Sequence, residues 1–284
     1  MPTATDSGFL SVSKHADTTA ADILSQLPQG YDIVRYSTNE KLAKAVKDLE
    51  SKLKDDDTFN QYLVVLHLPH TVLQELDDDR SIIGKRTRIT YFGGEDLAII
   101  KVMPDDVHEN IHTEFMTTFA DLACDMGMDR KREIRVFGAT RRRSTPNDSS
   151  KEPDNGMSPK RARLFRQWPT LALEIGFSQS LPSLRSNARW WLQKSNNITG
   201  KVNIVLIFCV RKSRKLVHLE QWEMTTLPPS QRRTRSSAPN IKSAEAVPVP
   251  ACVKEIDITA TEATGQPLVL GFEKLFLRPP VGQE

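Results

Sequence analysis

Apolar residues at helical spacing predict three helices along the chain. The first covers residues 38 to 54 and begins with a capping box formed by Ser37 and Glu40. Two more helices are predicted over residues 107 to 126 and 181 to 194. The apolar face of the first consists of Leu42, Val46, Leu49 and Leu53, and that of the second of Ile111, Phe115, Phe119, Leu122 and Met126.

Short apolar runs predict strands between these helices. Residues 88 to 92 and 97 to 103 flank Gly93-Gly94 and predict a hairpin. Residues 203 to 210 are apolar throughout, as in a strand covered on both faces, and residues 215 to 224 alternate as its antiparallel neighbour. Further strands are predicted at 62–68, 133–139, 168–175, 254–260 and 267–277. Because helices and strands are interspersed, the pattern predicts an α/β fold.

Three polar segments interrupt this pattern. Residues 1 to 20 are rich in Ser, Thr and Ala and are expected to be disordered. Residues 143 to 161 are rich in turn formers and predict a polar loop. Residues 227 to 250 predict a low-complexity loop before the C-terminal strands.

Composition narrows the class of protein. The 284 residues are 38% hydrophobic and 26% charged, which is ordinary for a soluble globular protein. No apolar run approaches the ~20 residues of a transmembrane helix, and the N-terminal residues lack the pattern of a secretory signal. The three scattered cysteines, Cys124, Cys209 and Cys252, fit a reducing compartment. We therefore expect an intracellular protein, cytoplasmic or nuclear, with no membrane partner.

Positive charge is concentrated in three clusters, although the net charge is only +3. Residues 129 to 143 hold seven basic and two acidic residues, and residues 160 to 166 hold four more basic residues. The third cluster covers residues 231 to 235. Such clusters can contact phosphate, which favours nucleic acid as a partner, although each alone is also compatible with a solvated surface.

One carboxylate stands out within the predicted strand at 168–175. Leu171, Leu173 and Ile175 alternate with Ala172 and Glu174. A buried carboxylate must be neutralised, paired or bound to a cation, so Glu174 is a candidate functional residue unless this is an edge strand that turns Glu174 into water.

A second carboxylate, Asp154, lies in the polar loop before this strand. Two carboxylates on neighbouring strands can jointly hold a hard cation such as Mg²⁺. The bound ion could then activate a water and stabilise charge on a phosphate.

These residues resemble a known superfamily. Pro153-Asp154, followed by Glu174 at the end of an apolar strand, is similar to the PD-(D/E)XK restriction-endonuclease-like superfamily, and the nearest branch is the Uma family of endonucleases with its fungal relatives. The segment PTLALEIGFSQS resembles that family's "P, apolar strand, E, then S-x-S" segment. Residues 94 to 128 resemble its strand pair, histidine-led turn and first long helix. ARWWLQKS followed by NIVLIFCV resembles its later helix and strand, so the likeness covers about residues 88 to 224.

The resemblance implies a domain organisation. It predicts a restriction-endonuclease-like core, a mixed central sheet flanked by helices, over residues 88 to 226. A helix-strand extension over residues 21 to 87 would precede it, and strands within residues 251 to 284 would pack on it. Relatives in this superfamily often act as dimers, which makes a homodimer possible.

The resemblance also implies a chemistry. Asp154, Glu174 and the backbone carbonyl of Ile175 would hold Mg²⁺ or Mn²⁺, and Arg185 or Arg189 would steady the phosphate. The implied function is a metal-dependent nuclease that hydrolyses nucleic-acid phosphodiesters, DNA or RNA. The alternative is a degenerate relative that has lost catalysis and binds nucleic acid or protein.

The chain departs from the superfamily motif at one position. A lysine is expected two residues after the second acid, and Gly176 stands there. In the Uma branch the lysine lies in the following helix, where this chain offers Arg185 and Arg189 on one face and Asn187 between them. Because arginine stays protonated it cannot act as a base, so the departure bears on catalysis more than on fold.

A rival motif lies upstream. His108, Glu109 and His112 form H-E-x-x-H, whose two histidines bind zinc in metalloproteases while the glutamate acts as base. The motif falls at the start of the predicted helix, and no H-x-x-G-x-x-H extension follows it. We therefore retain a zinc metalloprotease only as a minor alternative.

Overall fold

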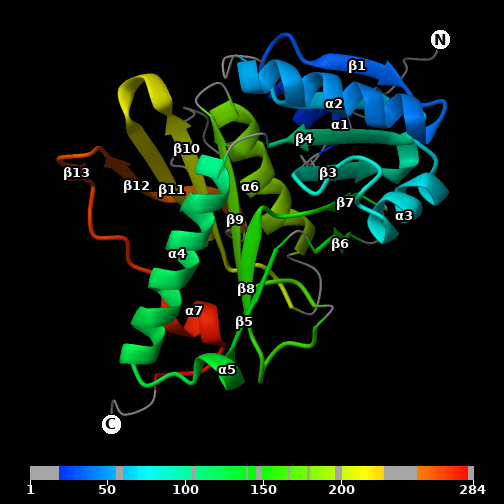
Figure 1. The fold of residues 1–284 in the computed structure, drawn as a ribbon. Coiled ribbons are helices and arrows are strands. Elements are labelled where there is room, and N and C mark those ends of the chain that lie inside the picture. Colours follow the sequence, from blue (N-terminus) through cyan, green and yellow to red (C-terminus); the bar gives the residue numbers. More distant parts are fainter. Residues whose placement is uncertain are drawn as a thin grey trace, which may run out of the picture.

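A computed structural model describes most of the chain. The described residues are 19–55, 60–103, 106–138, 140–144, 149–165, 167–177, 180–195, 200–226 and 248–280, and the structural statements below concern these residues. The protein is a mixed α/β structure with two mixed sheets flanked by helices (Figure 1).

Sheet A has six strands. Its β1 and β2 are parallel, and its remaining pairs are antiparallel. Residues 21 to 87, predicted as an N-terminal extension, contribute β1 and β2, and β2 pairs with β4. Strands from both sides of the domain boundary predicted at residue 88 therefore belong to one sheet. In spatial order the strands are β1 (Asp32–Arg35), β2 (Tyr62–Leu66), β4 (Leu97–Val102), β3 (Thr87–Phe92), β7 (Ser149–Lys151) and β6 (Arg142–Arg143).

Sheet B has seven strands. Its β9 and β10 are parallel, whereas every other neighbouring pair is antiparallel. In spatial order the strands are β13 (Ala263–Thr264), β12 (Pro248–Ile258), β11 (Leu216–Thr226), β10 (Ile204–Arg211), β9 (Leu171–Phe177), β8 (Asn155–Pro159) and β5 (Ile134–Phe137).

The helices form layers with these sheets (Figure 1). Helices α2 and α3 cover one face of sheet A, and α4 and α7 cover one face of sheet B. Between the two sheets lie α1 and α6. The helix bounds are α1 (Ala20–Ser25), α2 (Asn39–Asp55), α3 (His70–Asp78), α4 (Asp106–Asp125), α5 (Arg130–Glu133), α6 (Leu181–Ser195) and α7 (Phe272–Phe276).

Burial follows the alternation of strand β9. Leu171, Leu173 and Ile175 pack in the core against α4, whereas Ala172 packs in the core against α6. Since successive side chains of a strand point to opposite faces, Glu174 points to the α6 side. Strand β9 lies between β8 and β10, and Glu174 is only 1% exposed. The alternative of an edge strand that turns Glu174 into water is therefore wrong.

Most predicted elements are confirmed, and a few need correction. Residues 143 to 161 are not one loop, because they contain strands β7 and β8, whose buried side chains are largely polar and show no apolar alternation. Residues 267 to 277 contain helix α7 rather than a strand. Leu122 on α4 is exposed instead of belonging to the buried face, and Met126, which is also exposed, lies just beyond the end of this helix.

The N-cap of helix α2 differs from the one predicted. The Lys41 N–H of α2 donates to Thr38 Oγ1 at 3.4 Å, so Thr38 rather than Ser37 is the N-cap of this helix, which begins at Asn39.

Of the segment expected to be disordered, residues 1–18 lie outside the described residues, whereas Thr19 and Ala20 form the start of helix α1. Of the expected loop at 227–250, residues 227–247 lie outside the described residues, and Pro248 begins β12. Among the helices described, none is long and apolar enough to cross a lipid bilayer.

Candidate functional site

Two carboxylates meet where strands β8 and β9 lie side by side. Asp154 directly precedes β8, and its N–H donates to the Leu173 carbonyl at 3.1 Å. The Ile175 N–H of β9 donates to Asp154 Oδ2 at 2.7 Å. Asp154 and Glu174 are each 1% exposed. Strand pairing therefore buries the two predicted acids in one site.

A lysine from the other sheet neutralises Asp154. Lys101 lies on β4, and its Nζ is 2.7 Å from Asp154 Oδ2. The same ammonium donates to the carbonyl oxygen of Ile175. Burial alone would lower the pKa of Lys101, but the charges of Asp154, Tyr62 and Glu174 raise it above its ordinary value. Lys101 is therefore a buried cation that joins the two sheets.

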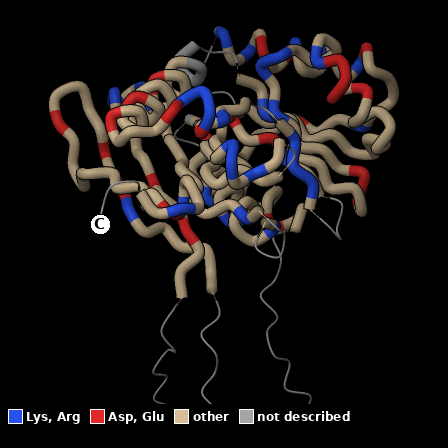
Figure 2. The backbone as a smooth tube through the Cα atoms, turned by 90° about the horizontal axis from the view of Figure 1, so that it is seen from below, with Lys and Arg blue, Asp and Glu red and all other residues tan. Residues whose placement is uncertain are grey.

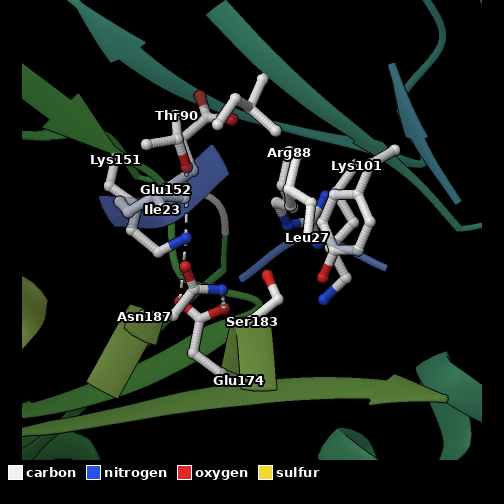
Figure 3. Close-up of a pocket in the computed structure, with 12 residues that line it drawn as sticks. Ile23, Leu27, Arg88, Thr90, Lys101, Lys151, Glu152, Glu174, Ser183 and Asn187 are labelled. Carbon is white, nitrogen blue, oxygen red and sulfur yellow. Dashed lines mark hydrogen bonds and ion pairs between the residues drawn. The ribbon is translucent and has the colours of Figure 1, made fainter. Parts of the chain in front are cut away.

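Glu174 has its own set of donors. Trp191 Nε1 donates to Glu174 Oε1 at 2.6 Å, and Asn187 Nδ2 donates to Oε2 at 3.2 Å, both from helix α6. Lys151 Nζ lies 3.6 Å from Oε1 and also donates to Thr90 Oγ1 at 3.2 Å. Figure 3 shows Lys151 between Thr90 and Glu174. Each oxygen of Glu174 thus already accepts a hydrogen bond.

Burial disfavours the charged forms of both Glu174 and Lys151. Burial raises the pKa of Glu174, and the nearby charge of Lys151 opposes that shift only in part. Burial likewise lowers the pKa of Lys151, although Glu174 acts in the opposite direction. The pair therefore tends toward neutrality, in contrast to Lys101.

A further carboxylate, Glu152, anchors the strand that leads to Asp154. It pairs with Arg80 and with Arg141, whose Nη2 lies 3.1 Å from Glu152 Oε1. Its Oε2 accepts the Ile89 N–H at 3.0 Å. These bonds fix β7 against β3 and help to explain why the polar segment around Asp154 is ordered and buried.

The space between these side chains is very small. It forms a cavity of about 10 Å³, close to the minimum for a single water. Helix α1 and the residues after it cover one side of the cavity with Ile23 and Leu27, and α6 contributes Ser183 (Figure 3). The carboxylates are therefore enclosed by the chain itself.

The predicted metal ligands converge, yet they do not fit a hydrated cation in this geometry. The ammonium of Lys101 occupies the place between Asp154 Oδ2 and the Ile175 carbonyl. Mg²⁺ needs near-octahedral oxygen ligands and usually keeps several waters. Among the described residues, no group of three or more His, Cys, Asp or Glu side chains could hold a metal ion.

The two arginines predicted to act on phosphate have other contacts. Arg185 Nε donates to Glu220 Oε1 at 2.9 Å, and Arg189 Cζ lies 5.5 Å from the centre of the Trp222 ring. Of the helix α6 candidates, it is Asn187 that reaches the carboxylate pair.

Packing explains why glycine stands where the superfamily motif has lysine. A Cβ on Gly176 would lie 2.3 Å from Ser180 Oγ and 3.3 Å from two Leu184 methyl carbons. Ser180 and Leu184 are themselves fully buried. The close approach of α6 to β9 therefore leaves no room for any side chain at this position.

The rival zinc motif is only partly described. The side chains of His108 and Glu109 lie outside the described residues. His112 is buried, and its Nδ1 lies 3.1 Å from Asn155 Nδ2.

Sequence reasoning missed Lys101 and Lys151. Lys101 is the single charged residue of the apolar run LAIIKVM, which is the same signal that pointed to Glu174. Lys151 lies three residues before Asp154, within a stretch interpreted as a loop.

No protein-family model matches the chain, and no curated protein matches it significantly.

Proposed function

We propose that this chain is a nucleic-acid-binding protein of nuclease-like architecture in which lysines of the chain itself take the place of the catalytic metal. The observation that carries the proposal is the position of Lys101, whose ammonium joins Asp154 Oδ2 and the Ile175 carbonyl. These are two of the three groups that the resemblance assigns to a metal ion. A divalent cation would have to displace Lys101 and enlarge a cavity of about 10 Å³.

The arrangement of elements supports the nuclease-like part of the proposal. After helices α4 and α5 the chain forms β5, passes through β6 and β7 of sheet A, and returns to sheet B as β8 and β9, with β5–β8 and β8–β9 antiparallel. Helix α6 and then β10, parallel to β9, follow. The helices lie on opposite faces of this sheet. A mixed sheet with a helix on each face and the acids at β8 and β9 is what the resemblance leads us to expect.

The distribution of charge supports nucleic acid as the partner. In Figure 2, many Lys and Arg positions lie toward the middle of the molecule, whereas most Asp and Glu positions lie toward its edges. The basic segment at 129–143 ends at β6, directly beside the strand that carries Lys151. Positive charge therefore reaches the neighbourhood of the carboxylate pair.

A metal-dependent nuclease is the second candidate function. It is favoured by the burial of both predicted acids, with Asp154 and the Ile175 carbonyl sharing the ammonium of Lys101 and with Glu174 beside Lys151. It would require Lys101 to move away from the position that a metal would occupy.

One assay separates the two candidates. Purified protein is incubated with labelled single-stranded and duplex DNA and RNA, with excess Mg²⁺ or Mn²⁺, beside Glu174→Gln. We expect a mobility shift without cleavage in both proteins. Cleavage by the wild type that is lost in Glu174→Gln would contradict the proposal and support the nuclease.

A further inference from the structure

An open pocket lies beside the carboxylate site, at the edge of sheet A. It has a volume of about 560 Å³ and is lined by Arg141, Arg142, Arg143, Phe165 and Trp168, together with Thr140. This volume is within the range of small-ligand sites. The wall combines guanidinium groups with aromatic rings, which are the groups that contact phosphates and bases.

The central arginine of this wall is buried and uncompensated. Arg142 is only 4% exposed. Within the described part of the chain, neither its Nε nor its Nη2 has a hydrogen-bond partner, and its Nη1 donates to the backbone carbonyl of Arg141. Arg141, by contrast, is paired with Asp77 and Glu152. Buried charges are normally paired, and none of the described residues supplies an anion to Arg142.

Two cation–π contacts hold the positive groups and rings in place. Arg142 Cζ lies 5.0 Å from the centre of the Phe137 ring, and Arg135 Cζ lies 5.7 Å from the centre of the Phe165 ring. Burial and the charge of Arg135 lower the pKa of Arg142 to about 10. An anion between the two guanidinium groups would relieve their repulsion.

The ring of Phe165 is available to a ligand. The residue is 64% exposed. An exposed ring next to a phosphate site can stack on a nucleobase only when that base is unpaired, because paired bases are already stacked within a duplex.

A strand pairing and a ring contact link the pocket to the carboxylate site. Arg142 of β6 is directly opposite Lys151 of β7, and opposite residues of paired strands point to the same face. Trp168 in the pocket wall packs against Trp191, with ring centres 5.6 Å apart, and Trp191 donates to Glu174.

We propose that this pocket binds an unpaired nucleotide of a nucleic-acid strand, with its phosphate on Arg142 and its base on Phe165. The inference rests on the proposed nucleic-acid-binding function and assigns that function a site and a single-stranded ligand. It requires no metal ion and no catalysis.

Fluorescence anisotropy with a labelled oligothymidylate in EDTA tests the proposal without cleavage. Arg142→Gln removes the buried charge, and Phe165→Ala removes only an exposed ring. Arg132→Gln is the matched control, because Arg132 belongs to the same basic segment but its side chain is 78% exposed and paired with Asp129. We expect about tenfold weaker binding for each pocket variant and less than about twofold for the control.

The outcomes distinguish a failure of the pocket assignment from a failure of the proposed nucleic-acid-binding function. If Arg142→Gln binds no more weakly than Arg132→Gln, the pocket assignment is overturned while nucleic-acid binding stands. If Arg142→Gln does not fold by circular dichroism, Phe165→Ala decides, and unchanged affinity overturns the assignment. Duplex DNA bound as tightly as the single strand, with no loss in Phe165→Ala, also overturns it. If the folded wild type binds no oligonucleotide, the pocket assignment and the proposed function both fail.

Discussion

The Nζ of Lys101 lies 2.7 Å from Oδ2 of Asp154, and both side chains are almost completely buried. Lys101 lies on β4 of sheet A, and Asp154 directly precedes β8 of sheet B. The ion pair therefore joins the two sheets at the place where the superfamily resemblance implies a metal ion. A buried pair of this kind tolerates the loss of one partner poorly, because the other charge is left uncompensated.

The first prediction concerns Lys101→Met. This variant should lose about 3–5 kcal/mol of folding free energy, because the buried Asp154 then loses the ammonium of Lys101 and keeps the more distant Arg88, whose Nε lies 3.8 Å from its Oδ1. The double variant Lys101→Met/Asp154→Asn should recover part of the loss. Urea denaturation of both variants and of Asp154→Asn alone measures this, and a double-variant loss equal to the sum of the two single losses would show that the pair carries no coupling.

Mn²⁺ provides a companion test on the same variant. Once the ammonium is removed, Asp154 Oδ2 and the Ile175 carbonyl both face the place that it occupied. Excess Mn²⁺ should therefore raise the melting temperature of Lys101→Met more than that of the wild type or of the double variant, because a ligand stabilises the state that binds it. Equal shifts in all three proteins would mean that Mn²⁺ acts elsewhere.

The second prediction uses two buried carboxylates in one cross-strand row. Glu174 of β9 is opposite Ile207 of β10, which is opposite Glu220 of β11. Burial raises the pKa of Glu174. Burial opposes ionisation of Glu220 too, but hydrogen bonds from Arg185, Trp222 and His218 together lower its pKa.

The two glutamates should give opposite pH profiles. The folded state binds the Glu174 proton more tightly than the unfolded state, so its contribution to stability falls as pH rises from about 4.3 through the raised pKa. Glu220 contributes stability above about pH 4.3, and that stability is lost as pH falls through its lowered pKa. Melting temperatures measured from pH 3 to pH 7 test this. As the pH rises, the melting temperature of Glu174→Gln should increase relative to that of the wild type, and that of Glu220→Gln should decrease relative to it. Parallel curves would contradict both assignments.

The third prediction concerns Gly176. Gly176→Ala should cost about 1–3 kcal/mol, because the added Cβ overlaps Ser180 Oγ and presses on Leu184. Adding Ser180→Ala should restore part of that stability, since the overlapping oxygen is then gone. Gly176→Lys, which would recreate the superfamily motif, should destabilise the protein further instead of adding a functional lysine. Chemical denaturation measures all three, and a stable Gly176→Lys protein would contradict this explanation.

The fourth prediction separates the two arginines of helix α6. Arg185→Ala removes an ion-pair partner of the fully buried Glu220 and should lower the free energy of unfolding by about 2 kcal/mol. This loss is smaller than for a fully buried pair because Arg185 is partly exposed. Arg189→Ala removes only a cation–π contact with Trp222 and should cost less than about 1 kcal/mol. If Arg185→Ala keeps full stability but weakens nucleic-acid binding, the arginine has the phosphate role that the resemblance implies.

Much of the fold could be predicted from the sequence, because its elements carry strong apolar patterns. The strands at 203–210 and 215–224 and the helix at 181–194 are confirmed with small changes at their ends. Strands β7 and β8 could not be predicted, because polar side chains fill them. Their burial depends on pairing with β3 and β9 and on ion pairs such as that between Glu152 and Arg141.

The site was predictable only in part. Glu174 was detectable as a lone carboxylate in an apolar strand, and Asp154 through its position in the resemblance. Lys101 lies 53 residues before Asp154 and in the other sheet, so no local pattern relates the two residues. Nor does the helical spacing of Arg185 and Arg189 reveal that Arg185 donates a hydrogen bond to Glu220.

Calorimetric titration of Mn²⁺ into the wild-type protein tests the central claim most directly. Because Lys101 occupies the place between Asp154 and the Ile175 carbonyl, we predict no heat of binding beyond dilution, with the fold intact by circular dichroism. Saturable binding by the wild type that is lost in Glu174→Gln would contradict the account, since it would mean that a metal ion displaces Lys101 from the carboxylate site.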